Sequence, residues 1–470
     1  MNQHSPRPDR APIVSLNPAT DEELARFQPH DAAAIEAALA GAVRAQRDWA
    51  RRPVEDRCAP LLRLAAELRA DKDRYARLMT LEMGKPIVEA EAEIEKCAVT
   101  AEHYAAHGPG YLASEVIASN ASHSEVVFDP LGVVLAVMPW NYPFWQFVRF
   151  AAPGLAAGNA AILKHASNVP QCALAIQEVF EKAGFPQGLV STLLIGGGAV
   201  SGVLADPRIA AVTLTGSTDV GALVAAEAGR LLKPQVLELG GSDPFIVLDD
   251  ADVQAAAAVA VKARFQNTGQ SCIAAKRFIV TPGAADAFAE AFTRHAAALK
   301  VGDPMDRSVA IGPMARANLR DELHAQVQAS VAEGATLLMG GRAPEGPGAF
   351  YAPTALDHVR ADVTVFRRET FGPAAAIVRV ADEDAAIAAA NDSEFGLGAA
   401  IWSADTDRAR ALARRIDAGA VFVNGMTASD ARLPFGGVKR SGYGRELGAW
   451  GARAFTNVKT IWVGPARPPK

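Results

Sequence analysis

The chain has 470 residues, which is too many for one simple hydrophobic core, so we expect two or three domains. Half of the residues are apolar, and 47 basic residues nearly balance 52 acidic ones, which gives no reason to expect nucleic acid or an anionic membrane as a partner. The polar N-terminus lacks the apolar core of a secretory signal, and no apolar run reaches the ~18 residues of a membrane span.

The cysteine and histidine patterns argue against a metal site or a disulfide framework. Four scattered cysteines form no closely spaced pair: Cys58, Cys97, Cys172 and Cys272. This usage fits a reducing, cytoplasmic setting. His103 and His107 are four residues apart in a predicted helix, but no acidic partner accompanies them, so we expect a helix face and no metal.

The first quarter of the chain is predicted to be helical. Asp31 is placed to cap an Ala-rich helix that runs to about Arg51, and Pro53 begins a second long helix. A third helix is expected at about 86–107. Residues 1–12 and 464–470 are expected to be loose ends.

Short β-rich runs then alternate with helices. Strands are expected at 124–128, 133–137, 160–164, 190–195 and 210–215, and helices at 170–183 and 219–228. A second alternation runs from 253 to about 424, with strands near 278–280, 375–380 and 420–423. Such alternation predicts parallel sheets covered by helices on both faces. The expected fold class is therefore α/β, with two doubly wound domains.

A polar turn, Phe265–Ser271, ends in Cys272 between a helical run and a strand-like run. A thiol at such a junction can be presented beside a backbone N–H, and attack on a carbonyl needs a donor for the developing oxyanion. The alternative is a buried cysteine that serves as a small apolar residue. Catalysis requires the sulfur to face a cleft.

Two stretches are candidates for binding a phosphate-bearing cofactor. Gly216–Gly221 follows a strand and begins a helix, so its free N–H groups and the Ser217 hydroxyl could hold a pyrophosphate. The alternative is a capped helix start with no ligand. Lys164 ends a strand at the carboxyl edge of the sheet, where it could contact a ribose or remain a solvated surface lysine.

Three further positions suggest carbonyl chemistry. Glu238 lies between leucines, and a partly desolvated carboxylate with a raised pKa can take a proton from water; the alternative is a structural Glu bonded to backbone N–H groups. Asn141 precedes Pro143, which suits the first turn of a helix, so its side-chain NH₂ is expected to be free to donate. Trp145 and Arg149 share a face of that helix and could line a pocket with a guanidinium at its far end.

Six motifs occur along the chain: Pro139-Trp140-Asn141, Gly216–Gly221, Leu237–Gly241, Asn267–Cys272, Glu369–Pro373 and Pro434–Lys439. With them the chain resembles the aldehyde dehydrogenase superfamily over nearly its full length, and most resembles bacterial succinate-semialdehyde dehydrogenases. The resemblance implies a homodimer or homotetramer with three parts. They are an atypical Rossmann cofactor domain (1–114 and 133–241), a catalytic domain (242–450) and a small β oligomerisation arm (115–132 and 451–470).

The resemblance also implies a role for individual residues. Cys272 would be the nucleophile, Asn141 and the Cys272 N–H would hold the oxyanion, and Glu238 would activate the deacylating water. Cofactor contacts are implied for Trp140, Lys164, Ser167, Gly216, Ser217, Glu369 and Phe371. Substrate contacts are implied for Trp145, Arg149, Gln266, Ser429 and Phe435, with Asp430 as a further candidate. The implied reaction oxidises a small aldehyde, succinic semialdehyde above all, to its acid with NAD or NADP through a thioester.

Three positions depart from the family pattern. Ser167 stands where a Glu often disfavours a 2′-phosphate, so both NAD and NADP stay open. Gln266 stands where many succinate-semialdehyde enzymes have an arginine, which leaves Arg149 as the single guanidinium for a substrate carboxylate, or as one half of a structural ion pair. Ala274 stands where some relatives have a second cysteine, so no redox disulfide is expected there.

Other functions remain open from the sequence. The chain could act on other aliphatic or aromatic aldehydes, pass the acyl group to CoA, or be a thiol hydrolase without a cofactor. Glu238 favours hydrolysis over transfer to CoA. A thiol hydrolase would need a histidine near Cys272, and none is close in the sequence.

Overall fold

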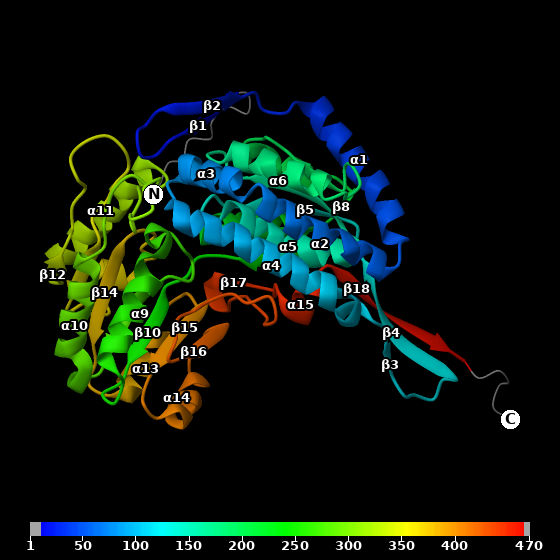
Figure 1. Ribbon diagram of the computed structural model, residues 1–470. Coiled ribbons are helices and arrows are strands. Elements are labelled where there is room, and N and C mark those ends of the chain that lie inside the picture. The colour runs from blue at the N-terminus through cyan, green and yellow to red at the C-terminus, as the bar shows by residue number, and fades with distance from the viewer. Residues whose placement is uncertain (1–10, 465–470) are drawn as a thin grey trace.

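The computed structural model describes residues 11–464, so most of the expected loose ends lie outside the described residues. Figure 1 shows a body built on two sheets with helices packed against them and a thin arm of strands that projects from one side. The predicted α/β fold class with two doubly wound sheets and a small β arm is confirmed. No helix within residues 11–464 is both long enough and apolar enough to cross a membrane.

The N-terminal segment forms a hairpin and four helices. They are β1 (Ile13–Leu16), β2 (Glu23–Phe27), α1 (Ala32–Ala50), α2 (Val54–Ala70), α3 (Lys72–Met83) and α4 (Ile87–Leu112). The Asp31 carboxylate caps α1 by accepting the Ala34 N–H at 2.8 Å, as predicted. The helix α4 runs past its predicted end because Gly108 packs tightly on α2, where an added Cβ would lie 2.8 Å from the Cys58 sulfur. Tertiary packing thus overrides the low helix propensity of glycine.

The first sheet has the order β7-β6-β5-β8-β9, with all five strands parallel and the short β17 (Gly442–Tyr443) antiparallel at the edge. The five strands are β5 (Val133–Met138), β6 (Ala160–His165), β7 (Val190–Thr192), β8 (Ile209–Thr215) and β9 (Gln235–Glu238). The helices between them are α5 (Pro143–Ala156), α6 (Pro170–Lys182), α7 (Val200–Ala205) and α8 (Thr218–Arg230). The strand order reverses between β5 and β8, and ligands bind at the carboxyl edge beside such a switch point.

The second sheet has the order β12-β13-β14-β11-β10-β15-β16, parallel except for β12. Its strands are β10 (Asp243–Val247), β11 (Ala275–Val280), β12 (Thr336–Met339), β13 (Thr354–Asp357), β14 (Ala374–Arg379), β15 (Gly398–Trp402) and β16 (Ala420–Val423). Its helices are α9 (Val253–Phe265), α10 (Pro282–Ala297), α11 (Ala317–Ala332), α12 (Thr364–Arg367), α13 (Glu383–Asn391) and α14 (Thr406–Ala413). The segment Leu239–Ser242 alone separates β9 of the first sheet from β10 of the second. Every residue of β10 and β11 is buried, as expected for central parallel strands.

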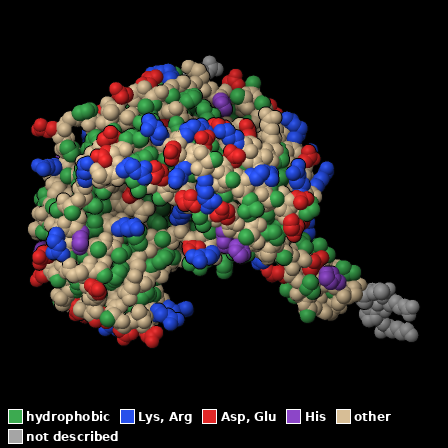
Figure 2. Space-filling model, viewed as in Figure 1, with side chains coloured by type: hydrophobic (Ala, Val, Ile, Leu, Met, Phe, Trp, Pro, Cys, Tyr) green, Lys and Arg blue, Asp and Glu red, His purple; other side chains and the backbone are tan. Residues whose placement is uncertain are grey.

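The arm is a three-stranded antiparallel sheet with the order β18-β4-β3. Its strands are β3 (Glu115–Val116), β4 (His123–Pro130) and β18 (Thr456–Val463), and the short helix α15 (Gly448–Arg453) precedes β18. Although only two residues separate β4 from β5, these strands belong to different sheets. Figure 2 shows the arm standing away from the body, with a hollow between them.

Candidate active site

Cys272 lies in a short connection between the end of α9 and the start of β11. The first residues after α9 form a 3₁₀ turn, η2 (Gln266–Gly269), in which Asn267 and Thr268 both have a φ of 55° and Gly269 has a φ of 71°. Non-glycine residues rarely adopt this left-handed conformation, which persists only where the surroundings impose it. The turn leads from α9 into the connection that carries Cys272 and continues into β11.

Buried charged groups hold this turn in place. The Lys276 ammonium donates to the carbonyl oxygens of Ser271 and Cys272, both at 2.9 Å. The Arg264 guanidinium donates to the Gly269 carbonyl at 3.0 Å. A buried cation needs acceptors to replace its lost water, and here backbone carbonyls supply them. The backbone around Cys272 is therefore anchored by side chains that do not themselves occupy the space in front of the sulfur.

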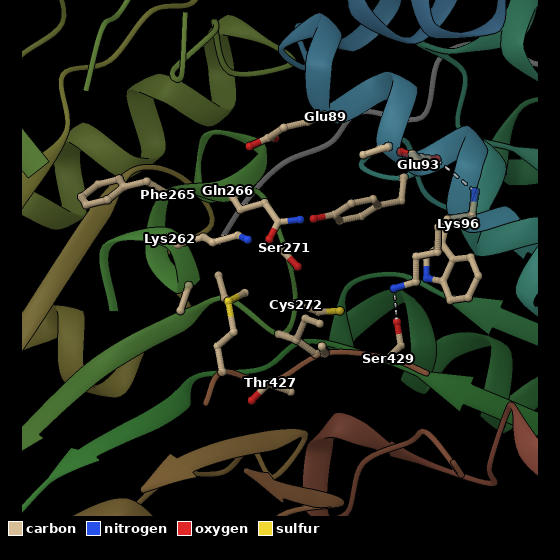
Figure 3. Close-up of a pocket in the computed structure, with 18 of the residues that line it drawn as sticks. Glu89, Glu93, Lys96, Lys262, Phe265, Gln266, Ser271, Cys272, Thr427 and Ser429 are labelled. Atoms are coloured by element: carbon tan, nitrogen blue, oxygen red, sulfur yellow. Dashed lines mark hydrogen bonds between the residues drawn. The ribbon is translucent and has the colours of Figure 1, made fainter. Parts of the chain in front are cut away.

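The half-buried Cys272 side chain lines a cavity of 680 Å³. Figure 3 shows the thiol in this cavity, with α4 on one side and the segment that carries Thr427 and Ser429 on another. The requirement that the sulfur face a cleft is met. The same cavity brings together all five residues that the sequence suggested for the substrate: Trp145, Arg149, Gln266, Ser429 and Phe435.

Burial raises the pKa of the Cys272 thiol to about 12, although Arg149 and Lys276 act to lower it. The thiol is therefore protonated at neutral pH, and a base must take its proton when it attacks a carbonyl. The other cysteines lie in the core: Cys58, Cys97 and Cys172. Of the four, Cys272 alone lines the cavity.

Asn141 is buried beside the turn, directly after β5. Its side-chain NH₂ donates to the Gln270 carbonyl at 3.1 Å, so it is less free than the sequence suggested. An amide NH₂ carries two N–H groups, and one remains for another acceptor. The Asn267 side chain donates to the Asn141 carbonyl at 2.9 Å, which joins the end of β5 to the strained turn. Asn141 therefore has a fixed position relative to Cys272.

Glu238 ends β9 and is only 1% exposed. Neither of its carboxylate oxygens has a hydrogen-bond partner in the described part of the chain. Burial raises the pKa of Glu238, Arg149 acts to lower it, and Glu446 acts to raise it further. This environment is the one that the sequence suggested for a base, because a desolvated carboxyl group holds its proton more strongly than one in water.

Arg149 forms an ion pair through Nε with Glu446, and both side chains are almost completely buried. Its Nη2 also donates to the Thr215 hydroxyl at 3.3 Å, and its guanidinium lies 4.9 Å from the Phe435 ring centroid. The structural ion pair that the sequence left open for Arg149 is thus present. Its charge is compensated inside the protein, although the side chain also borders the cavity.

The residues suggested for the cofactor lie along the carboxyl edge of the first sheet. Ser217 caps α8, where its hydroxyl accepts the Val220 N–H at 3.5 Å, and Gly216 donates its N–H to the Glu238 carbonyl at 3.0 Å. Lys164 ends β6 and has no ion-pair partner among residues 11–464, while Ser167 is exposed in the turn that follows. The free N–H groups at a helix start and a lysine with no ion-pair partner in the described residues fit a group that carries phosphates.

A second group of cofactor candidates comes from the second sheet. Glu369 accepts the Gly241 N–H at 3.0 Å, and a Cβ on Gly240 would lie 2.6 Å from its other carboxylate oxygen and 3.1 Å from the Thr218 hydroxyl. A side chain at position 240 would therefore press on Glu369 and on the start of α8. The rings of Trp140 and Phe371 meet edge to face at 5.7 Å. Residues that follow strands of the second sheet thus meet residues at the carboxyl edge of the first, and the donors, cation and carboxylate gathered among these candidates fit the chemistry of a dinucleotide.

Sequence reasoning missed several charged residues at the site: Lys96, Glu89, Arg264, Lys276 and Glu446. Lys276 offered a signal, since a lysine inside an otherwise apolar, doubly buried strand needs internal partners. Lys96 and Glu89 offered none, because α4 is long and carries many charged residues. The Glu89 carboxylate accepts the Asn267 N–H at 2.6 Å, and burial raises its pKa to about 7.

Among residues 11–464, no histidine has a visible part in this site. His295 borders the cavity, but no contact joins its ring to Cys272 within the described residues. The His103 and His107 rings lie 4.6 Å apart on α4, and His103 contacts the Tyr111 hydroxyl at 3.1 Å. In the described part of the chain, no His, Cys, Asp and Glu side chains form a group that could hold a metal ion.

Comparison with known proteins agrees with this geometry. A probable succinate-semialdehyde dehydrogenase [NADP(+)] of Synechocystis is 51% identical over 451 residues, covering 96% of this chain and 99% of the relative. A succinate semialdehyde dehydrogenase [NAD(P)+] of Escherichia coli is 50% identical over 449 residues, covering 96% of this chain and 97% of the relative.

Solved structures give the same result. The crystal structure of succinic semialdehyde dehydrogenase from Streptococcus pyogenes in complex with NADP+ is 38% identical, with a TM-score of 0.94 over 96% of this chain and all of that one. The model of the aldehyde dehydrogenase family matches residues 6–461. The chain belongs to the aldehyde dehydrogenase family.

Proposed function

We propose that this protein oxidises succinic semialdehyde to succinate, with NADP or NAD as the hydride acceptor and Cys272 as the nucleophile. The observation that carries the proposal is the position of Cys272, just after a strained turn and in the lining of a cavity. Relatives about half identical to this chain are named for the same substrate and cofactors, which supports the choice of both.

The first step joins the Cys272 sulfur to the aldehyde carbon while the thiol proton passes to a base. The carbonyl oxygen becomes an oxyanion, which accepts from the remaining Asn141 N–H and from the Cys272 backbone N–H. A bound nicotinamide supplies the hydride acceptor for the oxidation. The chain's own part is to hold the carbon in place and leave an acyl group on sulfur as a thioester.

The second step releases the acid. Glu238 takes a proton from a water molecule that attacks the thioester, and the sulfur leaves as the thiolate. The buried, unpartnered carboxylate of Glu238 suits this role because its raised pKa makes it a stronger base than an exposed Glu. Retention of such a base supports hydrolysis over transfer to CoA. The lack of a histidine contact to Cys272 in the described residues argues against a thiol hydrolase.

The cofactor would lie along the carboxyl edge of the first sheet. Lys164 would contact the adenine-side ribose and any 2′-phosphate, Ser217 and the start of α8 would hold the pyrophosphate, and Glu369 would bind the second ribose. Ser167 brings no negative charge near Lys164, so a 2′-phosphate meets no repulsion there. This arrangement supports the use of NADP as well as NAD.

We assign residues 1–114 and 133–241 to cofactor binding, 242–450 to catalysis, and 115–132 and 451–470 to an oligomerisation arm. The outer strand of the arm exposes four large apolar residues: Val458, Ile461, Trp462 and Val463. An exposed apolar edge strand favours pairing with another chain. A dimer or tetramer of this chain would cover it. All four cysteines are free thiols, in keeping with a reducing cytoplasm.

The test is to mix the enzyme and succinic semialdehyde with NADP or with NAD, and to follow the absorbance of the reduced nicotinamide and the succinate formed. We expect equal amounts of both products without CoA. Reduction that requires CoA would replace this proposal with acyl transfer. Succinate formed without any nicotinamide would replace it with another reaction.

A further inference from the structure

One cation in the active-site cavity lacks a partner of opposite charge. Lys96 extends from α4 into the cavity, donates to the Ser429 hydroxyl at 2.6 Å, and lies 4.3 Å from the Trp145 ring centroid. Both contacts are to neutral groups. No carboxylate is within ion-pair distance of its ammonium among residues 11–464. A half-buried ammonium held only by a hydroxyl and an indole has lost water without gaining a counter-ion.

The other cations near the cavity are already engaged or exposed. Arg149 is paired with Glu446, and Lys276 donates to backbone carbonyls beneath Cys272. Lys262 borders the cavity at an exposed position, where water screens its charge. The acidic residues around Lys96 are occupied too, since Glu93 pairs with Lys85 and Asp430 with Arg432.

We propose that the Lys96 ammonium and the Ser429 hydroxyl bind the carboxylate of the substrate. This inference rests on the proposed function, because it needs an aldehyde that carries a negative charge. Figure 3 shows Lys96 and Ser429 meeting at one side of the cavity into which Cys272 projects. An ammonium has three donors, so Lys96 can keep Ser429 and still donate to a carboxylate. A bound carboxylate would complete the charge balance that the protein leaves open.

A carboxylate site at Lys96 would also explain why Gln266 can stand where many relatives have an arginine. Gln266 borders the same cavity without a charge. If Lys96 supplies the positive charge from α4, a second guanidinium next to the turn is not needed. The carboxylate would then lie against α4 and Trp145, and the aldehyde end would be left to Cys272.

The experiment compares two aldehydes of nearly equal shape. Succinic semialdehyde carries a carboxylate, whereas 4-methylpentanal carries an isopropyl group in its place. Lys96→Met should lower kcat/KM for succinic semialdehyde about 10- to 100-fold, the range expected for a lost hydrogen bond to a charged group. It should change kcat/KM for 4-methylpentanal less than about threefold. Lys96→Arg retains the charge and should recover much of the loss.

The outcomes separate this inference from its rivals. An equal loss for both aldehydes would make Lys96 a structural residue, and no loss for either would place the anchor elsewhere. A larger selective loss in Lys262→Met than in Lys96→Met would give the role to Lys262. Each of these results would overturn the inference.

The proposed function fails in a different way. If kcat/KM of the wild-type enzyme is as high for 4-methylpentanal as for succinic semialdehyde, the substrate class is wrong while the dehydrogenase chemistry stands. If it reduces nicotinamide with neither aldehyde, the chemistry itself is wrong. Succinate, which keeps the carboxylate, gives a further check: it should inhibit the wild type competitively and inhibit Lys96→Met much less.

Discussion

Two charged regions border the same cavity and differ in how their charges are balanced. The Glu238 cluster, formed by Glu238, Arg149 and Glu446, is closed: its cation and one carboxylate pair with each other. The Lys96 site, formed by Lys96, Ser429 and Trp145, is open, because its cation contacts only neutral groups. Burying a charge without a partner costs free energy, so an open site is suited to a ligand of opposite charge. The closed cluster instead shifts the pKa of the protein's own Glu238, which Arg149 acts to lower and Glu446 acts to raise.

The largest effect should come from Cys272, which lines the same cavity. Cys272→Ala removes the nucleophile, and we expect kcat to fall at least about 10⁴-fold with any aldehyde. Because the alanine leaves the carboxyl edge of the first sheet unchanged, binding of NADP, measured by fluorescence titration, should be retained. Turnover within tenfold of the wild type would show that neither region serves a thioester mechanism.

The closed cluster is tested by Glu238→Gln, which keeps the shape and removes the base. Deacylation should slow about 10²- to 10⁴-fold, the usual contribution of a general base. Rapid mixing should then give a burst of about one reduced nicotinamide per active site, followed by slow turnover. If the variant is slow from the first turnover, without a burst, then Glu238 acts before or during the oxidation step.

Arg149→Met should act on stability rather than on substrate choice. It leaves Glu446 buried without its partner, which costs about 3–5 kcal/mol of unfolding free energy. Thermal unfolding should therefore shift to lower temperature, and succinic semialdehyde and 4-methylpentanal should lose activity by similar factors. The double variant Arg149→Met with Glu446→Gln removes both charges and should recover part of the stability. A loss confined to succinic semialdehyde, in a stable protein, would return the anchor to Arg149.

The smallest effect concerns pH at the open site. Burial lowers the pKa of Lys96 to about 8, Arg149 lowers it too, and Cys97, Glu93 and Asp430 act to raise it. The ammonium is charged below this pKa and loses its proton above it. KM for succinic semialdehyde should therefore rise above pH 8, toward about tenfold per pH unit. It should stay level for 4-methylpentanal, and in Lys96→Arg, whose guanidinium keeps its charge.

The sequence was sufficient for the fold, since alternating strands and helices predicted two sheets. It also singled out Cys272, Glu238 and Asn141 as candidates, because unusual residues stood at strand ends and turns; their roles remain predictions. Such signals depend on residues that are neighbours in the sequence, so they can be read without a structure. The hairpin β1–β2 was missed, since its strands are short and partly exposed.

Long-range pairings could not be predicted. The sequence offered both roles for Arg149, and only the structure showed that Glu446, from the far end of the chain, is its partner. Lys96 went unnoticed for the same reason: the periodicity of α4 does not tell which of its charged residues will face another domain. Burial and pairing of a charge are properties of the assembled fold.

The pairing of β17 with β9 has a consequence for how the enzyme is made. This edge strand brings Glu446 beside Arg149 and Glu238, and β18 follows within the last residues of the chain. A growing polypeptide on the ribosome therefore carries Cys272 long before it carries the carboxylate that neutralises Arg149. Nascent or truncated chains that end before residue 446 would hold an uncompensated guanidinium in their core, so the machinery for handling aldehydes is assembled only when synthesis is almost finished.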